Sequence, residues 1–66
     1  MNSRPYHYEI PDAAPSDYFE TIEECVDACK AECADLGVDY GRRDVMLFMT
    51  DADGTWEVTE EGELAG

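Results

Sequence analysis

Hydrophobic residues in the middle of the chain recur with the period of an α-helix. The apolar positions follow one another at steps of three and four, and they are Phe19, Ile22, Val26, Cys29, Cys33 and Leu36. This spacing places one apolar stripe along about five turns, the side that a surface helix buries. Asp17 and Glu20 have the spacing of an N-terminal capping box, and Gly37 follows the stripe as a terminating glycine. A helix is therefore predicted over residues 17–36.

Alternating segments on both sides of this helix predict β-strands. In YHYEI the residues Tyr6, Tyr8 and Ile10 share one side, which predicts a half-buried strand over residues 5–10. The segments DVMLFMT and TWEVTEE flank the turn sequence DADG. They predict a hairpin with strands over residues 44–50 and 55–60, closed by a type I′ turn at Asp53-Gly54.

The element order β-α-β-β predicts one α+β domain over residues 1–66, a mostly antiparallel three-stranded sheet with the amphipathic helix packed on one face. The first strand is expected to pair antiparallel with the third, giving the spatial order 1-3-2. The alternative places the first strand parallel to the second through a right-handed crossover. The strand residues expected to pack against the helix are Tyr6, Tyr8, Ile10, Trp56 and Val58.

The second strand carries apolar residues on both of its sides. Val45, Leu47 and Met49 alternate with Met46 and Phe48, so one set is expected on the sheet face that the helix leaves uncovered. Leftover apolar surface on a small protein often marks a contact site. A homodimer or a partner protein could use it.

The segment DADGTW also resembles the middle of a calcium-binding EF-hand loop. With Gly54 at the sixth position, the ligand positions would fall on Asp51, Asp53, Thr55, Glu57 and Glu60. Met49 would occupy the first ligand position, and a thioether does not bind a hard cation. The flanking segments are strand-like, whereas the motif needs a helix on each side. A plain hairpin turn is therefore favoured.

Cysteines and the single histidine are the remaining candidates for chemistry. Cys25, Cys29 and Cys33 lie one turn apart on the predicted helix and could chelate zinc together with His7. The spacing differs from a paired-cysteine knuckle, and two of the thiols belong to the apolar stripe, so reduced core thiols are expected and metal binding stays open. His7 is expected to be a solvated neighbour of Glu9. No catalytic motif is present, so neither an enzyme nor a cofactor is predicted.

Charge is the strongest compositional signal. The chain has 17 acidic and 4 basic residues, a formal net charge of −13 and a sequence pI near 4.1. Like charge disfavours direct binding to nucleic acid or to an anionic membrane, and the expected partner is a basic, nucleic-acid-binding protein or complex. The longest apolar run, VMLFM, is too short to span a bilayer, and the first ten residues lack a secretory signal, so a cytoplasmic location is expected.

Ten acidic residues outside the predicted core form the candidate binding surface. They are Glu20, Glu23, Glu24, Asp27 and Asp35 on the helix, and Asp51, Asp53, Glu57, Glu60 and Glu61 around the hairpin, with Glu63 beside them. Acids three or four residues apart lie roughly 5–6 Å apart on a helix, close to the ~6–7 Å between phosphates along a nucleic-acid strand. Such rows fit a solvated surface, adaptation to high salt, or mimicry of nucleic acid.

In size, charge and layout the chain resembles the small acidic phage anti-CRISPR proteins that act as DNA mimics against the type I surveillance complex. The helix segment SDYFETIEECVDACKAECADLG and the hairpin segment DVMLFMTDADGTWEVTEE carry this resemblance. It implies a non-enzymatic inhibitor that covers a basic DNA-contacting surface in the host cell cytoplasm. The alternatives are a small acidic structural or interaction domain of a salt-adapted protein, or a weak metal-binding module.

Overall fold

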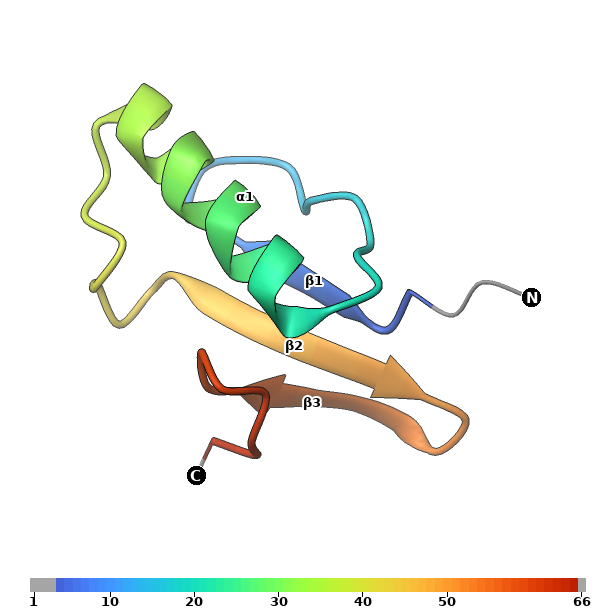
Figure 1. The fold of residues 1–66 in the computed structure, drawn as a ribbon. Helices are drawn as coiled ribbons and strands as arrows, with labels where there is room; N and C mark the ends of the chain where they lie inside the picture. Colours follow the sequence, from blue (N-terminus) through green and yellow to red (C-terminus); the bar gives the residue numbers. More distant parts are fainter. Residues whose placement is uncertain (1–3, 66) are drawn as a thin grey trace.

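The chain forms one open sheet with a helix across it. The computed structural model describes residues 4–65, and within them the order is β1 (Tyr6–Glu9), α1 (Ile22–Leu36), β2 (Met46–Asp51) and β3 (Gly54–Val58). All strand pairs are antiparallel, and α1 lies on one face of the sheet (Figure 1). The predicted α+β architecture is confirmed. No helix among these residues has the length and apolar character needed to cross a membrane.

The sheet order is β1-β2-β3, so the predicted order 1-3-2 is wrong. The alternative of a parallel first and second strand is wrong as well, because β1 pairs antiparallel with β2. The physical reason is the segment between β1 and α1, which already returns along β1: the N–H of Phe19 donates to the carbonyl of Tyr6, and the N–H of Ser16 to that of Tyr8. The helix then runs in the direction of β1, and β2 comes back beside it without a crossover (Figure 1).

The helix begins at Ile22, five residues later than predicted. Thr21 is its N-cap, and the Thr21 hydroxyl accepts a hydrogen bond from the N–H of Glu24 at 3.1 Å. Asp17 lies outside the helix because the chain around it is paired with β1. The predicted end is confirmed: Gly37 has φ 71°, and Val38 donates to the carbonyl of Cys33 in the pattern of a Schellman motif.

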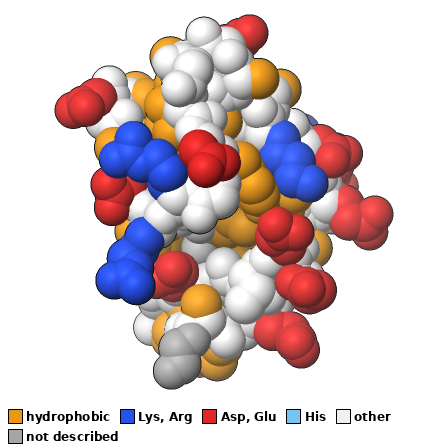
Figure 2. All heavy atoms as spheres, turned by 90° about the vertical axis from the view of Figure 1, so that its left-hand side faces the viewer, with side chains coloured by type: hydrophobic (Ala, Val, Ile, Leu, Met, Phe, Trp, Pro, Cys, Tyr) orange, Lys and Arg blue, Asp and Glu red, His pale blue; other side chains and the backbone are white. Residues whose placement is uncertain are grey.

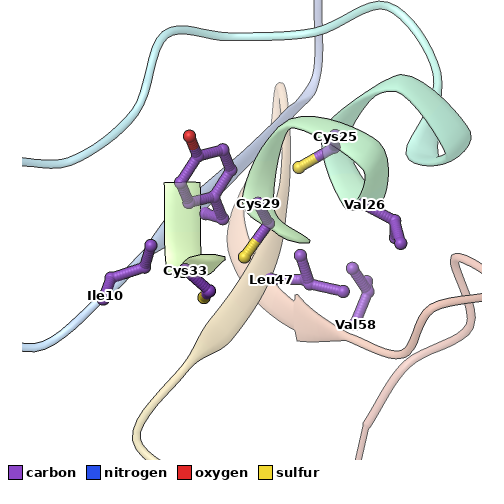
Figure 3. Close-up of a cluster of buried hydrophobic side chains, with 8 residues drawn as sticks. Ile10, Cys25, Val26, Cys29, Cys33, Leu47 and Val58 are labelled. Carbon is purple, nitrogen blue, oxygen red and sulfur yellow. The ribbon is translucent and has the colours of Figure 1, made fainter. Parts of the chain in front are cut away.

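The core lies between α1 and the sheet face that it covers. Its buried hydrophobic residues are Tyr8, Ile10, Cys25, Val26, Cys29, Cys33, Leu47 and Val58 (Figure 3). Trp56 was predicted to be in the core but is 36% exposed. The helix packs mainly over β1, and Trp56 lies on β3, two strands away. Val58 reaches the core from β3, whereas Trp56 lies one pair nearer the hairpin tip, opposite Met49.

The hairpin is confirmed, but its turn differs from the predicted one. Asp51 pairs with Gly54, so the two central residues are Ala52 and Asp53 instead of Asp53 and Gly54. Neither central residue has positive φ, which a type I′ turn requires. Gly54 carries the unusual backbone angle, φ 145°, and the Asp51 side chain accepts the N–H of Asp53 at 2.7 Å. The aspartates therefore serve the turn geometry.

Irregular segments pair with both outer strands. Residues 16–19 lie along β1, and at the other edge the N–H of Ala65 donates to the carbonyl of Glu57 at 3.0 Å. The N–H of Thr59 donates to the carbonyl of Glu63, which holds the chain in a turn after β3. Covered edges limit strand-to-strand aggregation. The outer edges of the sheet are thus largely occupied by the chain itself.

Candidate functional site

All ten carboxylates of the candidate surface are exposed in the structure. They are Glu20, Glu23, Glu24, Asp27, Asp35, Asp51, Asp53, Glu57, Glu60 and Glu61. The fold distributes them over the segment before α1, the outer side of α1, the hairpin tip, the sheet face away from α1 and the turn after β3. They form several groups around the molecule, and each group has a different local structure.

Three acids form the densest group, on the first half of α1. Glu23, Glu24 and Asp27 are exposed and lie one turn or less apart, opposite the buried side of the helix. We call these three residues the α1 acidic row. Their mutual repulsion is partly offset because negative charge near a helix N-terminus interacts favourably with the helix dipole. Glu24 also contributes to the cap, since the Thr21 hydroxyl donates to its carboxylate at 3.2 Å.

The acidic row does not continue along the second half of α1. Lys30, Ala31 and Ala34 occupy the exposed positions that follow Asp27, and the next exposed acid is Asp35. Asp27 and Asp35 are eight positions apart, about 12 Å along the helix axis. Phosphate-like spacing is therefore confined to the first half of the helix, and Asp35 stands apart from it.

Glu20 was predicted to belong to the helix but precedes it. Its carboxylate lies 3.9 Å from the guanidinium Nε of Arg4, and both side chains are at least half exposed. An exposed pair of this kind contributes little to stability. It does reduce the negative charge beside the start of α1, so Glu20 is a weaker candidate than the three residues of the α1 acidic row.

The hairpin acids are divided between its tip and its far face. Asp51 and Asp53 lie at the tip, where the Asp51 carboxylate accepts the backbone N–H of Asp53. Glu57 lies opposite Phe48 in the pairing of β2 with β3, whereas the next residue, Val58, is in the core. Because side chains alternate along a strand, Glu57 faces away from α1. The sheet therefore separates Glu57 from the acids of α1.

Glu60 and Glu61 lie in the turn after β3, and Glu60 neighbours Tyr40, which contacts α1. Burial raises the pKa of Tyr40 above its ordinary value, and the neighbouring Glu60 carboxylate raises it further. The ammonium of Lys30 lies 5.3 Å from the centre of the same ring. Tyr40 thus neighbours both Lys30 of α1 and Glu60 of the turn after β3.

Basic side chains gather near the end of α1 and the loop that follows. Figure 2 faces this end of the molecule and shows Lys and Arg side chains among the acids, with hydrophobic atoms between them. Arg42 in this loop pairs with Asp44 at 3.1 Å, and both are exposed. The first half of α1, from Ile22 to Asp27, carries no Lys or Arg; Lys30 follows Asp27 one turn later, and Arg4 lies beside Glu20.

The three cysteines are core residues, as predicted. Cys25, Cys29 and Cys33 are free thiols, each at most 1% exposed, on the side of α1 that faces the sheet (Figure 3). Burial raises the pKa of Cys25 to about 11. Burial, with a further contribution from the neighbouring Cys33 thiol, raises the pKa of Cys29 to about 12. Among residues 4–65, no group of three or more His, Cys, Asp or Glu side chains is arranged to hold a metal ion.

His7 is buried, so its predicted solvated position is wrong. Only 7% of the residue is exposed, because the imidazole lies between the rings of Tyr18 and Phe48, with centroid distances of 4.8 and 5.0 Å. Its Nε2 lies 3.6 Å from the Glu9 carboxylate, and its Nδ1 is buried without a hydrogen-bond partner among the described residues. The signal missed in the sequence is Phe48, which pairs with His7 and shares its side of the sheet.

We call the sheet face away from α1 the open face. Strand alternation and pairing place seven residues on it, namely His7, Glu9, Met46, Phe48, Thr50, Thr55 and Glu57, and Tyr18 covers its edge at His7. Met46 and Phe48 are half-buried here, as expected for the apolar set that the helix leaves uncovered. The open face thus combines aromatic surface with two exposed carboxylates.

The chain matches no protein-family model, no curated protein and no solved structure.

Proposed function

We propose that the protein is a non-enzymatic inhibitor that presents carboxylates in place of nucleic-acid phosphates and occupies the DNA-binding groove of a basic protein complex. The observation that carries the proposal is the α1 acidic row: three exposed carboxylates on one rigid helix, in a chain with a formal net charge of −13. The resemblance to acidic phage anti-CRISPR proteins suggests the type I CRISPR effector complex as the target, in the cytoplasm of the host cell.

The α1 acidic row is suited to this role because a helix fixes the spacing of its side chains. Glu23 and Glu24 each lie one helical turn before Asp27, roughly 5–6 Å from it, similar to successive phosphates of one strand. The capping hydroxyl of Thr21 and the core residues of α1 keep the helix in place before binding. A pre-ordered row loses little conformational freedom when it meets a partner.

The remaining acids contribute mainly through their summed field. A chain of net charge −13 is attracted to a Lys- and Arg-lined groove over about a Debye length, which raises the association rate and makes it depend on salt. The same field disfavours direct contact with nucleic acid or with an anionic membrane. In this proposal the acids at the hairpin tip and in the turn after β3 steer the approach, and the α1 acidic row makes the contact.

The test is a competition assay on a type I effector complex. The complex is first incubated with the protein, and the binding of fluorescently labelled target DNA is then measured. The triple variant Glu23→Gln, Glu24→Gln, Asp27→Asn keeps side-chain size and the capacity for hydrogen bonding while removing three charges. Loss of three exposed ion pairs at about 0.5–1 kcal/mol each predicts roughly ten- to hundredfold weaker competition.

A matched control removes the same charge elsewhere. In the triple variant Asp17→Asn, Glu61→Gln, Glu63→Gln the changed residues are exposed and lie off α1, and competition should fall by less than about threefold, the part due to steering. Equal losses in the two variants would show a general charge effect and contradict mimicry by the row. Failure of the wild-type protein to reduce DNA binding would contradict the inhibitor proposal for this target.

A further inference from the structure

The open face has a composition that neither the helix row nor the core explains. The ring of His7 stacks on Phe48 and lies tilted against Tyr18, with centroid distances of 5.0 and 4.8 Å, and we call these three rings the aromatic stack. Tyr18 is 49% exposed, and Phe48 and the adjacent Met46 are half-buried. Aromatic rings that are partly exposed beside each other offer π-faces to a partner's cationic or planar groups.

Two carboxylates flank this stack and have no Lys or Arg partner in the described part of the chain. Glu57 lies beside Phe48 across β2 and β3, and Glu9 lies beside Met46 across β1 and β2. Glu9 and Glu57 lie on strands separated by β2, and their pairing positions on β2 are two residues apart. Their Cα atoms are therefore about 12 Å apart. Among residues 4–65 no Arg or Lys lies within ion-pair distance of either carboxylate; Glu9 faces only the imidazole of His7.

His7 makes the fold less stable than an apolar ring would at the same position. It is 93% buried, and its Nδ1 has no hydrogen-bond partner in the described part of the chain. A phenylalanine would fill the space between Tyr18 and Phe48 without a buried, unpaired polar atom. Local choices that reduce stability tend to occur where a surface has another use.

From these observations we propose that the open face is a second binding surface, which takes an arginine-bearing segment of a basic protein. A guanidinium is planar and stacks on aromatic rings, and its fork of N–H groups pairs with a carboxylate through two hydrogen bonds. The open face supplies both features side by side, with Phe48 and Tyr18 as stacking rings and Glu57 and Glu9 as acceptors.

Charge and side-chain shape favour an arginine-bearing segment over a second copy of the chain, nucleic acid, anionic lipid or a lysine-bearing segment. A second copy of the chain would bring another charge of −13 and would place Glu9 and Glu57 of each copy near those of the other. Nucleic acid and anionic lipid carry the same sign of charge and are repelled. A lysine-bearing segment has the correct charge, but its ammonium lacks the planar fork that matches rings and carboxylates together.

The inference goes beyond the proposed function, because it concerns the face of the sheet opposite α1. The experiment is amide chemical-shift mapping of the ¹⁵N-labelled protein with an oligo-arginine peptide and an oligo-lysine peptide of equal length. The arginine peptide should shift the amides of His7, Phe48 and Glu57 and bind about fivefold tighter at this face than the lysine peptide. Equal affinity for the two peptides, or shifts confined to α1, would overturn the proposal.

Variants keep the proposal testable on a folded protein. The double variant Tyr18→Leu, Glu57→Gln removes one exposed ring and one carboxylate from positions outside the core, and it should abolish the preference for arginine. The control double variant Glu23→Gln, Asp27→Asn changes α1 and should keep that preference. Preserved preference in the first variant would contradict the proposal. So would a wild-type dimer in sedimentation equilibrium that becomes a monomer in the Tyr18→Leu, Glu57→Gln variant. Loss of effector binding through α1 is a separate result and leaves this one unchanged.

Discussion

The phenol of Tyr8, on β1, donates a hydrogen bond to the carboxylate of Glu32, on α1. Tyr8 is a core residue at 5% exposure, and Glu32 is half-buried. Burial raises the pKa of the Tyr8 phenol above its ordinary value, and the hydrogen bond to Glu32 raises it further. Glu32 therefore has a structural role on the helix, because it ties α1 to the sheet.

The substitution Tyr8→Phe should lower the free energy of unfolding by about 1–2 kcal/mol, because it leaves the Glu32 carboxylate without its donor in a half-buried position. Urea unfolding followed by far-ultraviolet circular dichroism measures this change. Tyr18→Phe is the matched control: Tyr18 is 49% exposed, and loss of its hydroxyl should change stability by less than about 0.5 kcal/mol. Equal effects of the two substitutions would contradict a structural role for the Tyr8–Glu32 bond.

The buried thiols predict that the protein loses stability in alkali. The pKa of Cys25 is raised to about 11 and that of Cys29 to about 12, from an ordinary value of 9.0. Since the unfolded chain releases these protons at lower pH than the folded chain, the free energy of unfolding falls as pH rises above about 9. The urea midpoint should therefore be lower at pH 10 than at pH 8.

Thiol reactivity provides an independent check on the same groups. In the folded protein a disulfide reagent such as DTNB should react with Cys25, Cys29 and Cys33 far more slowly than in urea, because the thiols are at most 1% exposed and remain protonated. The single substitution Cys25→Ala should weaken the dependence of stability on alkaline pH. Rapid reaction of the native protein at neutral pH would show that the thiols are accessible and would refute their burial.

The helix start can be tested by two single substitutions. Thr21→Ala removes the hydroxyl that accepts the N–H of Glu24, and it should cost about 1 kcal/mol. Asp17→Ala should change stability by less than about 0.5 kcal/mol, because Asp17 is exposed and lies outside the helix. Urea unfolding of both variants distinguishes the observed cap from the one that the sequence pattern suggested. A larger loss for Asp17→Ala would reverse that assignment.

The contrast between Thr21 and Gly37 shows which features of this fold are local. Gly37 was predicted correctly because a terminating glycine needs only its own backbone angle, φ 71° here. The predicted helix start was wrong because Thr21 and Glu24 have the same capping spacing as Asp17 and Glu20. Pairing of Phe19 with Tyr6 decides between them, and that contact joins residues distant in sequence.

Some features of the candidate site could also be predicted from local sequence, and others depend on contacts between residues distant in sequence. Exposure of the acids could be predicted, since the apolar stripe of α1 determines which side of the helix faces solvent. Their grouping could not, because the face on which Glu57 lies depends on strand register and sheet order. His7 was missed for a related reason: Tyr18, which covers it, was expected to lie within the helix and instead belongs to the segment along β1.

His7→Phe should stabilise the protein by about 1 kcal/mol. The substitution keeps an aromatic ring between Tyr18 and Phe48 and removes the buried Nδ1 that lacks a partner. Thermal and urea unfolding at neutral pH measure the change, with His7→Ala as the comparison, which should destabilise because it removes the ring from the stack. A loss of stability in His7→Phe would mean that the imidazole makes a stabilising hydrogen bond in solution.

Ionic strength separates a displayed acidic surface from an adaptation to high salt. Added sodium chloride should raise the melting temperature, since screening weakens repulsion within a chain of net charge −13. The protein should nevertheless be folded at low ionic strength, because its core of Tyr8, Leu47, Val58 and the three thiols does not depend on ions. Thermal melts by circular dichroism over a sodium chloride series test both statements.

In the triple variant Glu23→Gln, Glu24→Gln, Asp27→Asn the salt dependence of the melting temperature should be smaller, because three mutually close charges are gone. A chain that folds only in molar salt would favour salt adaptation over mimicry as the reason for its acids.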